Sequence, residues 1–360
     1  MYAVEIRHIF ALLFSFLLGL YLVPIVIAAA KKIGFVDRPD GRLKRHKEPT
    51  PYLGGLAIFI AFITTLGLCF PFENQMLWFL FGTTLLLFVG LIDDLKVLRP
   101  AQKFFGQFIA VLCFLKGEFS LKNAFFSSPV NIFWSSFWML SVINAFNLVD
   151  VMDGLCGTLG LISSITLCGI AYAMGKYTTS LLLTAFIGAL GAFLAYNRPP
   201  AKIYLGDAGS LFVGGCLAAM PLLFDWDKTL FIWKFDGFLN VIYVYIKPLL
   251  EMFFVPCLIL WVPLVEGLGL FIIRTRLRMP FYYGSPHHFS IYLRKRGWSC
   301  AKVLGFAAAV SMLMSVLAVL FLYRLITLTW LMIWSILVVI GWVVLIFGFT
   351  KSGENTSAKP

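Results

Sequence analysis

Two adjacent carboxylates, Asp93 and Asp94, end one apolar stretch, and Lys103 and Gln107 follow at the start of the next. Neighbouring carboxylates repel each other, so they lower stability unless a cation or a proton is supplied. One of the two is therefore a candidate general base or metal ligand, and Lys103 is a candidate point charge for phosphate. The alternative is an ordinary helix end whose charges lie at an interface.

Four oxygen-bearing side chains recur at every third position after a later apolar stretch: Asn144, Asn147, Asp150 and Asp153. If one helix continued through all four, each step would turn by about 300°, and the side chains would form a slanting row on one face. Such a row could line a cavity, coordinate a hard cation or bind a polar ligand. The alternative is a solvated helix C-terminus that Gly154 caps.

A third group surrounds one carboxylate with small residues, in the chain order Asn197, Tyr204, Gly206, Asp207, Ala208, Gly209 and Ser210. The small residues let backbone and phosphate oxygens approach closely. We expect a helix to begin at Ser210, which places Asp207 just before a helix N-terminus, where anions are favoured. The alternative is a helix start at which Asp207 is only the cap.

Two basic loops complete the set of candidate residues. The loop 274–300 contains His287 and His288, a pair that suggests zinc, but the oxygen ligands of the Asp motifs fit Mg²⁺ better. We interpret His288 and its neighbours as contacts for a diphosphate, while for His287 a surface position in the loop is the alternative. The cations of the loop 31–52 suit polyphosphate or anionic headgroups, and the glycines that follow permit close helix packing.

The elements that position these residues lie in a membrane. Of the 360 residues, 61% are hydrophobic and only 13% are charged, whereas a soluble domain carries roughly 25% charged residues. The apolar stretches recur without a soluble block, which predicts one membrane domain over residues 1–350 and a disordered tail over 351–360. The seven cysteines are scattered and never spaced as CxxC, so neither a disulfide framework nor a zinc site is indicated.

The expected fold is all-α, a polytopic transmembrane helical bundle of about ten or eleven spans, because a span needs about 20 apolar residues. The stretch 229–247 could lie at the interface or form a further span. The candidate spans are 9–30, 53–70, 76–92, 104–115, 131–148, 157–175, 178–197, 211–224, 249–273, 301–323 and 326–349.

The orientation follows from the cations. When eleven spans alternate, the loops on one side hold 21 of the 29 Lys and Arg residues, so this side is predicted to be cytoplasmic. The N-terminus is then periplasmic, the C-terminus is cytoplasmic, and every Asp motif lies on the cytoplasmic side. The net charge of +12 is explained by loops near anionic membrane lipid, so nucleic acid is not expected as a partner.

In this order, the motifs of residues 31–300 resemble those of the polyprenyl-phosphate N-acetylhexosamine-1-phosphate transferases. The resemblance implies a bacterial cytoplasmic-membrane enzyme that transfers a sugar 1-phosphate from a UDP-HexNAc to polyprenyl phosphate and releases UMP. It implies that Asp207 binds Mg²⁺, or alternatively Mn²⁺, with help from Asn147, and that Asp93 and Asp94 lie on the side of the lipid phosphate. The residues it implies around the nucleotide sugar are Asn144, Asp150, Asp153, Asn197, Tyr204, His287 and His288.

Two departures from the family motifs leave the sugar open. The usual Asp-Gly-x-Asp-Gly has Val151 in place of its first glycine, and the histidine loop has only His287 and His288. The number of spans favours the GlcNAc-type branch, and hence an enzyme that initiates a surface polysaccharide. The alternatives are a phospho-N-acetylmuramoyl-pentapeptide transferase, a transporter, and a non-catalytic lipid-binding protein of the same fold. Whether the chain forms a homodimer also stays open.

Overall fold

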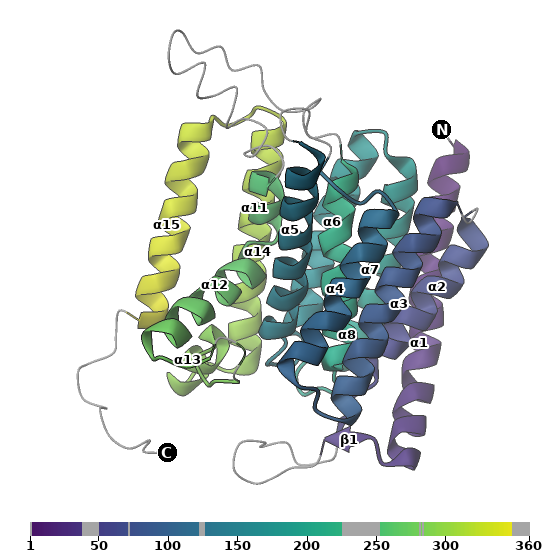
Figure 1. Ribbon diagram of the computed structural model, residues 1–360, viewed down its shortest axis with the longest axis horizontal. Coiled ribbons are helices and arrows are strands. Elements are labelled where there is room, and N and C mark those ends of the chain that lie inside the picture. The colour runs from purple at the N-terminus through teal and green to yellow at the C-terminus, as the bar shows by residue number, and fades with distance from the viewer. Residues whose placement is uncertain are drawn as a thin grey trace.

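The computed structural model describes residues 2–37, 50–70, 73–121, 127–224, 253–280, 282 and 284–347. This part of the chain is helical apart from two antiparallel two-residue strands, β1 (Val36–Asp37) and β2 (Thr50–Pro51), which the sequence did not predict (Figure 1). The prediction of an all-α fold is confirmed. The first helices are α1 (Tyr2–Ile33), α2 (Gly54–Cys69), α3 (Asn74–Leu95), α4 (Pro100–Lys116), α5 (Ser128–Val149), α6 (Leu155–Ala173), α7 (Tyr177–Asn197) and α8 (Gly206–Ala219). They are followed by a 3₁₀ turn (Met220–Leu223), α11 (Val255–Ile259), α12 (Trp261–Arg276), α13 (Phe289–Lys295), α14 (Cys300–Leu322) and α15 (Leu328–Phe347).

Seven helices of the described chain are long and apolar enough to cross a membrane, and α2 and α15 contribute shorter apolar helices. This confirms a polytopic membrane helical bundle. Large apolar side chains on α1 and α15 are exposed, as expected for surfaces that face lipid. The stretch 229–247 and the tail 351–360 lie outside the described residues.

The span expected over 249–273 is not one helix in the residues described from 253 onward. It is divided into α11 and α12 at Leu260, and α12 is inclined to the neighbouring helices (Figure 1). Pro263 has no N–H to bond the carbonyl of Ile259, so the helical ladder is interrupted there. The Ser163 hydroxyl of α6 donates to that Ile259 carbonyl at 3.1 Å, which satisfies the freed acceptor.

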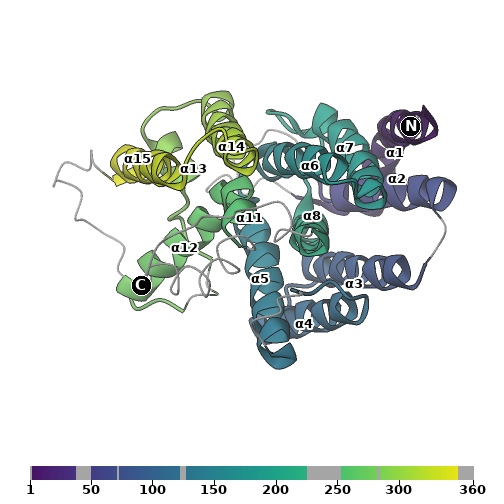
Figure 2. The same ribbon diagram turned by 90° about the horizontal axis from the view of Figure 1, so that it is seen from above.

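Helix α8 lies at the centre of the bundle, where it packs against α2, α3, α5 and α6 (Figure 2). Every residue of α8 except Asp207 is buried. Glycines allow the close approach of its neighbours: a Cβ on Gly55 would lie 2.2 Å from the Gly209 Cα, and one on Gly90 would lie 2.3 Å from the Ala208 nitrogen. The first turn of α8 is therefore fixed between α2 and α3.

Backbone hydrogen bonds connect the start of α2 to the segment that precedes α8. The amides of Gly54 and Gly55 donate to the carbonyls of Tyr204 and Leu205, each at 3.0 Å, and the Tyr204 amide donates to Pro51 at 2.7 Å. Amides in the first turn of α2 have no partner within their own helix, so the loop before α8 supplies their acceptors. This pairing holds the loop that leads to Asp207 in one place.

Candidate active site

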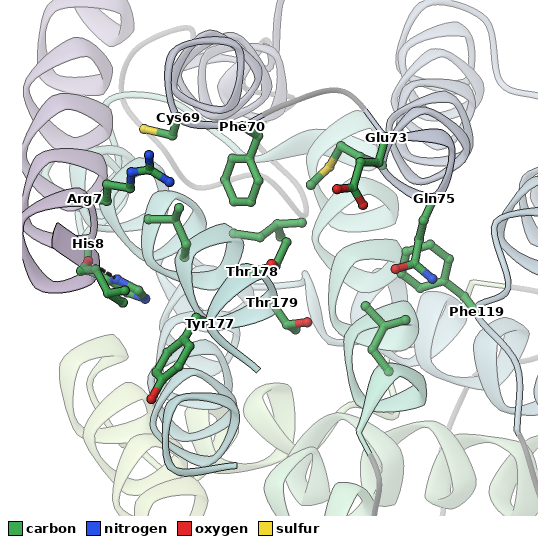
Figure 3. A pocket seen from close by; sticks show the side chains of 15 residues that line it. Arg7, His8, Cys69, Phe70, Glu73, Gln75, Phe119, Tyr177, Thr178 and Thr179 are labelled. Atoms are coloured by element: carbon green, nitrogen blue, oxygen red, sulfur yellow. Dashed lines mark hydrogen bonds between the residues drawn. The ribbon is translucent and has the colours of Figure 1, made fainter. Parts of the chain in front are cut away.

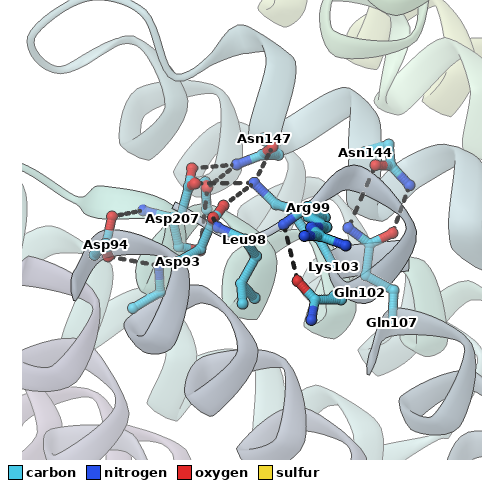
Figure 4. A network of polar contacts seen from close by, with 12 residues as sticks. Asp93, Asp94, Leu98, Arg99, Gln102, Lys103, Gln107, Asn144, Asn147 and Asp207 are labelled. Carbon is cyan, nitrogen blue, oxygen red and sulfur yellow. Dashed lines mark hydrogen bonds and ion pairs between the residues drawn. The ribbon is translucent and has the colours of Figure 1, made fainter. Parts of the chain in front are cut away.

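Four predicted site residues meet at one end of the bundle, each from a different helix (Figure 4). Asp93 comes from the last turn of α3, Lys103 from the first turn of α4, Asn147 from the last turn of α5 and Asp207 from the first turn of α8. The Lys103 Nζ lies 2.8 Å from Asp93 Oδ2, 2.9 Å from Asp207 Oδ2 and 3.0 Å from Asn147 Oδ1. We call these four residues the Asp–Lys cluster.

Further hydrogen bonds fix the orientation of each oxygen in the Asp–Lys cluster. The Asn147 Nδ2 donates to Asp207 Oδ1 at 2.6 Å and to Ser210 Oγ at 2.9 Å, which leaves its Oδ1 directed at Lys103. The Leu98 amide donates to Asp93 Oδ1 at 2.7 Å, which ties the loop between α3 and α4 to the same carboxylate. The cluster thus presents three oxygens around one cationic centre.

Asp94 has a different environment from its neighbour Asp93. Its two carboxylate oxygens accept hydrogen bonds from the backbone amides of Asp207 at 2.9 Å and Ala208 at 3.0 Å (Figure 4). These amides belong to the first turn of α8, where no partner exists within the helix and the helix dipole favours an anion. Gly206 is required beside it, since its φ is +73° and an added Cβ would lie 2.6 Å from Asp94 Oδ2.

The start of α8 differs from the prediction. The helix begins at Gly206 rather than at Ser210, so Asp207 lies inside the first turn and does not precede it. The cap is supplied by Asp94 from another helix, 113 residues away in sequence, and such a long-range partner leaves no local signal. The Asp207 carboxylate consequently does not cap α8, and it can take part in the Asp–Lys cluster.

The row expected from Asn144 to Asp153 is interrupted, because α5 ends at Val149. Asn144 is not part of the Asp–Lys cluster: its Nδ2 donates to Gln107 Oε1 at 2.8 Å, and Gln107 Nε2 donates back to Asn144 Oδ1 at 3.3 Å. This reciprocal amide pair lies one helical turn from the Lys103–Asn147 contact, so it joins α4 to α5 beside the cluster (Figure 4).

The loop between α5 and α6 holds Asp150 and Asp153 in unlike positions. Burial, together with the negative charges of Asp207 and Asp94, raises the pKa of Asp150 well above its usual range. Asp153 Oδ2 accepts a hydrogen bond from the Ala201 amide at 3.0 Å. Asp150 is therefore a carboxyl that resists ionisation close to the cluster, while Asp153 connects two loops.

Asn197 is buried, and both ends of its amide are engaged. Its Oδ1 accepts from the Gly154 amide at 2.9 Å, and its Nδ2 donates to the Ile203 carbonyl at 2.8 Å. Gly154 has a φ of +75°, a conformation that glycine adopts without strain. The predicted nucleotide residue Asn197 thus holds the loops before α6 and α8 together.

Tyr204 lies beside Tyr52, with their ring centroids 5.8 Å apart. The Tyr204 hydroxyl is hydrogen-bonded to Thr50, and that of Tyr52 to Asp37. Burial is the main cause that raises the pKa of both phenols, so both stay protonated at neutral pH. Tyr52 was not predicted to be a site residue, and its only signal in the sequence is its position two residues before the glycine pair that opens α2.

A second group of polar side chains joins α12 to the histidine loop, the segment that contains His287 and His288. The Glu266 Oε1 accepts from His288 Nδ1 at 3.0 Å and from the Phe289 amide at 3.2 Å, and Glu266 and His288 are both buried. The Arg274 Nε donates to Ser285 Oγ at 3.1 Å on the same helix-to-loop junction. Glu266 was missed in the sequence, although a carboxylate inside an apolar stretch is itself a functional signal.

The two histidines occupy distinct environments. His287 Nδ1 is buried and has no hydrogen-bond partner within the described chain. Burial and the nearby charges of Lys295 and Arg274 lower the pKa of His287, so its ring is neutral at neutral pH. Gly267, which follows Glu266 on α12, packs against α5: a Cβ on Gly267 would lie 3.7 Å from the Ala145 side chain. Helix α12, to which Glu266 fastens the histidine loop, therefore packs against the helix that carries Asn147.

The Asp–Lys cluster has the donor set of a hard-cation site. Among the described residues no group of three or more His, Cys, Asp and Glu side chains could hold a metal ion. Two carboxylates and one amide oxygen nevertheless surround the Lys103 ammonium, which shows that these oxygens accommodate a cation. Mg²⁺ prefers such oxygens and completes its shell with water and substrate phosphates, so the residues fit it.

Residues 76–225 match the model of the family described as glycosyl transferase family 4. This region begins in α3 and ends just after the 3₁₀ turn that follows α8, so it contains every residue of the Asp–Lys cluster. The match ends before the histidine loop. The family comparison thus covers the Asp–Lys cluster and leaves the Glu266–His288 pair outside.

Curated relatives match a longer part of the chain. It is 35% identical over 230 residues to a probable undecaprenyl-phosphate N-acetylglucosaminyl 1-phosphate transferase of Bacillus subtilis, which covers 61% of this chain and 63% of that protein. It is 34% identical over 225 residues to the phospho-N-acetylmuramoyl-pentapeptide-transferase of Enterococcus hirae, covering 56% of this chain and 70% of that protein. The Streptococcus pneumoniae G54 protein of the same name is 32% identical over 255 residues, which are 64% of this chain and 76% of that protein.

Proposed function

This multi-pass membrane protein belongs to glycosyl transferase family 4, and we propose that it transfers a sugar 1-phosphate from a UDP-HexNAc to polyprenyl phosphate. The observation that carries the proposal is the Lys103 ammonium held by the oxygens of Asp93, Asn147 and Asp207. Both substrates are anionic, so their reaction needs a site where carboxylates and cations balance the charge of the phosphates.

In the proposed reaction, an oxygen of the lipid phosphate attacks the β-phosphorus of the UDP-sugar. A new phosphorus–oxygen bond forms, the bond from that phosphorus to the oxygen bridging the two phosphates breaks, and UMP leaves with the electron pair. The lipid then carries the sugar through a diphosphate. Direct in-line attack is the simplest course, because positioning and charge stabilisation are what such a transfer requires of the protein.

The two neighbouring carboxylates have separate tasks in this proposal. Asp94 is occupied by two backbone amides of α8, so it is a positioning residue for Asp207. Asp93 lies against Lys103 and is the carboxylate placed to accept a proton from the lipid phosphate. Lys103 offsets the repulsion between the phosphates of donor and acceptor as they approach.

Asp207 and Asn147, with Asp93 nearby, would hold the divalent cation. Mg²⁺, or alternatively Mn²⁺, supplies neutralisation of phosphate charge when bound. The protein's own part is to keep the Asp207 carboxylate oriented, which the Asn147 amide does at Oδ1 and the Lys103 ammonium at Oδ2. Asp150, Asp153, Asn197, Tyr204 and the histidine loop are proposed to surround the nucleotide sugar.

The proposed donor sugar is N-acetylglucosamine, in line with the name of the Bacillus relative, and the product would begin a cell-envelope polysaccharide. The similarity to pentapeptide transferases supports a second candidate, a phospho-N-acetylmuramoyl-pentapeptide donor. The excess of cations in the loops on the side of the cluster supports a cytoplasmic position for the reaction.

A panel of UDP-sugars tests the proposal. Membranes that contain the protein are incubated with each donor, with and without polyprenyl phosphate and Mg²⁺, and UMP is measured, with tunicamycin as inhibitor. We expect UMP from UDP-GlcNAc only when lipid and metal are both present. Release from UDP-MurNAc-pentapeptide alone would establish the second candidate, and no release from any donor would refute the reaction class.

A further inference from the structure

A cavity of about 270 Å³ lies at the end of the bundle opposite the Asp–Lys cluster. Figure 3 shows the side chains that line it. It is formed where α1 meets the end of α2 and the beginnings of α3 and α7. Glu73 directly precedes α3, whereas Asp93 lies near its end, and 22 helical residues extend about 33 Å. Because the hydrocarbon core of a bilayer is about 30 Å thick, the cavity lies at the opposite membrane boundary.

Two exposed charges of opposite sign line this cavity, Arg7 from α1 and Glu73 from the segment before α3. Neither has an ion pair or a side-chain hydrogen bond with any other described residue. In the view of Figure 3 the Phe70 ring lies between them. The cavity therefore offers one cationic and one anionic position on either side of an apolar surface.

Two other polar side chains of the wall, His8 and Gln75, are already engaged. His8 Nδ1 lies 2.7 Å from the Val4 carbonyl and His8 Nε2 lies 3.1 Å from Ser180 Oγ. The Gln75 Nε2 donates to the Gly117 carbonyl at 3.0 Å. The unsatisfied charge is thus concentrated on Arg7 and Glu73, which makes these two residues the determinants of what binds.

Apart from the hydroxyl side chains of Tyr177, Thr178 and Thr179, much of the remaining wall is apolar. Phe70, Met76, Leu181 and Leu182 are buried side chains of its wall. A small soluble zwitterion would leave this surface uncovered, whereas a lipid places glycerol and acyl carbons against it. The position at the membrane boundary supplies such a molecule at high local concentration.

We propose that this cavity binds a zwitterionic phospholipid of the phosphatidylethanolamine type, with its phosphate at Arg7 and its ammonium at Glu73. A phosphate accepts hydrogen bonds from a guanidinium in a paired geometry, and a primary ammonium donates to a carboxylate. An anionic lipid such as phosphatidylglycerol would satisfy Arg7 but place its charge near Glu73. A choline headgroup has no N–H to donate to that carboxylate.

Native mass spectrometry of the full chain in detergent, titrated separately with the three lipids, tests this site. We expect the wild type to bind phosphatidylethanolamine about fivefold more tightly than phosphatidylglycerol or phosphatidylcholine, the ratio that one partly exposed charge pair of about 1 kcal/mol provides. Arg7→Gln should weaken all three lipids. Glu73→Gln should remove the preference, mainly because phosphatidylglycerol then binds better.

Matched controls use exposed charges near the same membrane boundary that do not line the cavity. Lys116→Gln neutralises a cation at the end of α4, and Glu5→Gln neutralises a carboxylate on α1. Both should keep the wild-type preference. Equal binding of the three lipids by the wild type, a preference that survives Glu73→Gln, or an equal change in the controls would overturn the proposal.

Discussion

The Asp–Lys cluster and the Glu266–His288 pair are both held by contacts near 3 Å, but the chain assembles them differently. Lys103 reaches partners 44 and 104 residues away on two other helices, whereas Glu266 and His288 are only 22 residues apart. The Asp–Lys cluster exists only when the whole bundle is folded, and the histidine loop is organised locally on α12. We therefore propose that the Asp–Lys cluster serves the chemistry common to all donors and that the histidine loop sets the preference for one UDP-sugar.

The largest effect should come from the centre of the Asp–Lys cluster. Asp207→Asn removes the carboxylate that both Lys103 and Asn147 contact, and kcat for UMP release should fall by about 10³. The variant should still melt close to the wild type in detergent, because the amide oxygen can accept from Asn147 while Lys103 keeps Asp93 and Asn147 as partners. Full turnover in this variant would refute the metal assignment.

The two adjacent carboxylates should show different roles when each is changed to its amide. Asp93→Asn should lower kcat by about 10² or more, because this side chain is proposed to accept a proton. Its loss of stability should be smaller than that of Asp94→Asn, because the amide oxygen can still accept from the Leu98 amide and Lys103 keeps Asn147 and Asp207 as partners. Asp94→Asn replaces one acceptor oxygen by an N–H that faces a backbone amide of α8, so unfolding should become easier by about 1–3 kcal/mol. Thermal melting and UMP release, measured on both variants, distinguish the roles. Equal losses of stability in the two would contradict the division.

The difference between the two regions also explains what the sequence could predict. The sequence predicts the four residues of the Asp–Lys cluster because polar side chains at the ends of apolar helices lower stability unless a partner or a ligand binds them. These residues are Asp93, Lys103, Asn147 and Asp207. The cap that Asp94 forms on α8 could not be predicted, since its partners are 113 residues away and are backbone groups. Membership in a helix could be predicted from apolar runs, but which side chains face each other depends on packing.

Two further differences between the prediction and the structure also arise from contacts between helices. Asn144 was grouped with Asn147 by spacing alone, yet its amide pairs with Gln107, because α4 and α5 lie side by side and each offers a complementary amide. The division of the span 249–273 depends on Pro263 and on the Ser163 hydroxyl that accommodates the break. The proline was visible in the sequence, but its compensating partner on α6 was not.

A smaller effect is expected in the histidine loop. Glu266→Gln keeps the hydrogen-bonding shape but removes the charge beside His288, so kcat/KM for the preferred UDP-sugar should fall by about tenfold, equal to about 1.4 kcal/mol. The ratio of kcat/KM between two UDP-sugars should change as well, which a merely structural role would not produce. Glu266→Asp should restore part of the ratio.

The matched control for Glu266 is Thr275→Val on the same helix, an exposed side chain whose hydroxyl, within the described part of the chain, donates only to the Phe271 carbonyl of its own turn. It should leave both kcat/KM values unchanged. If Glu266→Gln lowered turnover with all donors equally, the pair would serve the chemistry common to all donors, and the comparison with the Asp–Lys cluster would fail.

The last effect concerns stability rather than turnover, at the edge of the Asp–Lys cluster. Burial and the charges of Asp207 and Asp94 raise the pKa of Asp150, so the folded chain holds this proton more tightly than the unfolded chain does. Between the unfolded pKa near 4 and the raised folded pKa, the folded state therefore loses stability as pH rises, by at most about 1.4 kcal/mol per pH unit. Asp150→Asn has no proton to lose, so its melting temperature should exceed that of the wild type by more at pH 8 than at pH 5. Glu5→Gln, which removes an exposed carboxylate, should show no such trend. A constant difference between Asp150→Asn and wild type across this range would show that Asp150 ionises as readily in the folded chain as in the unfolded one.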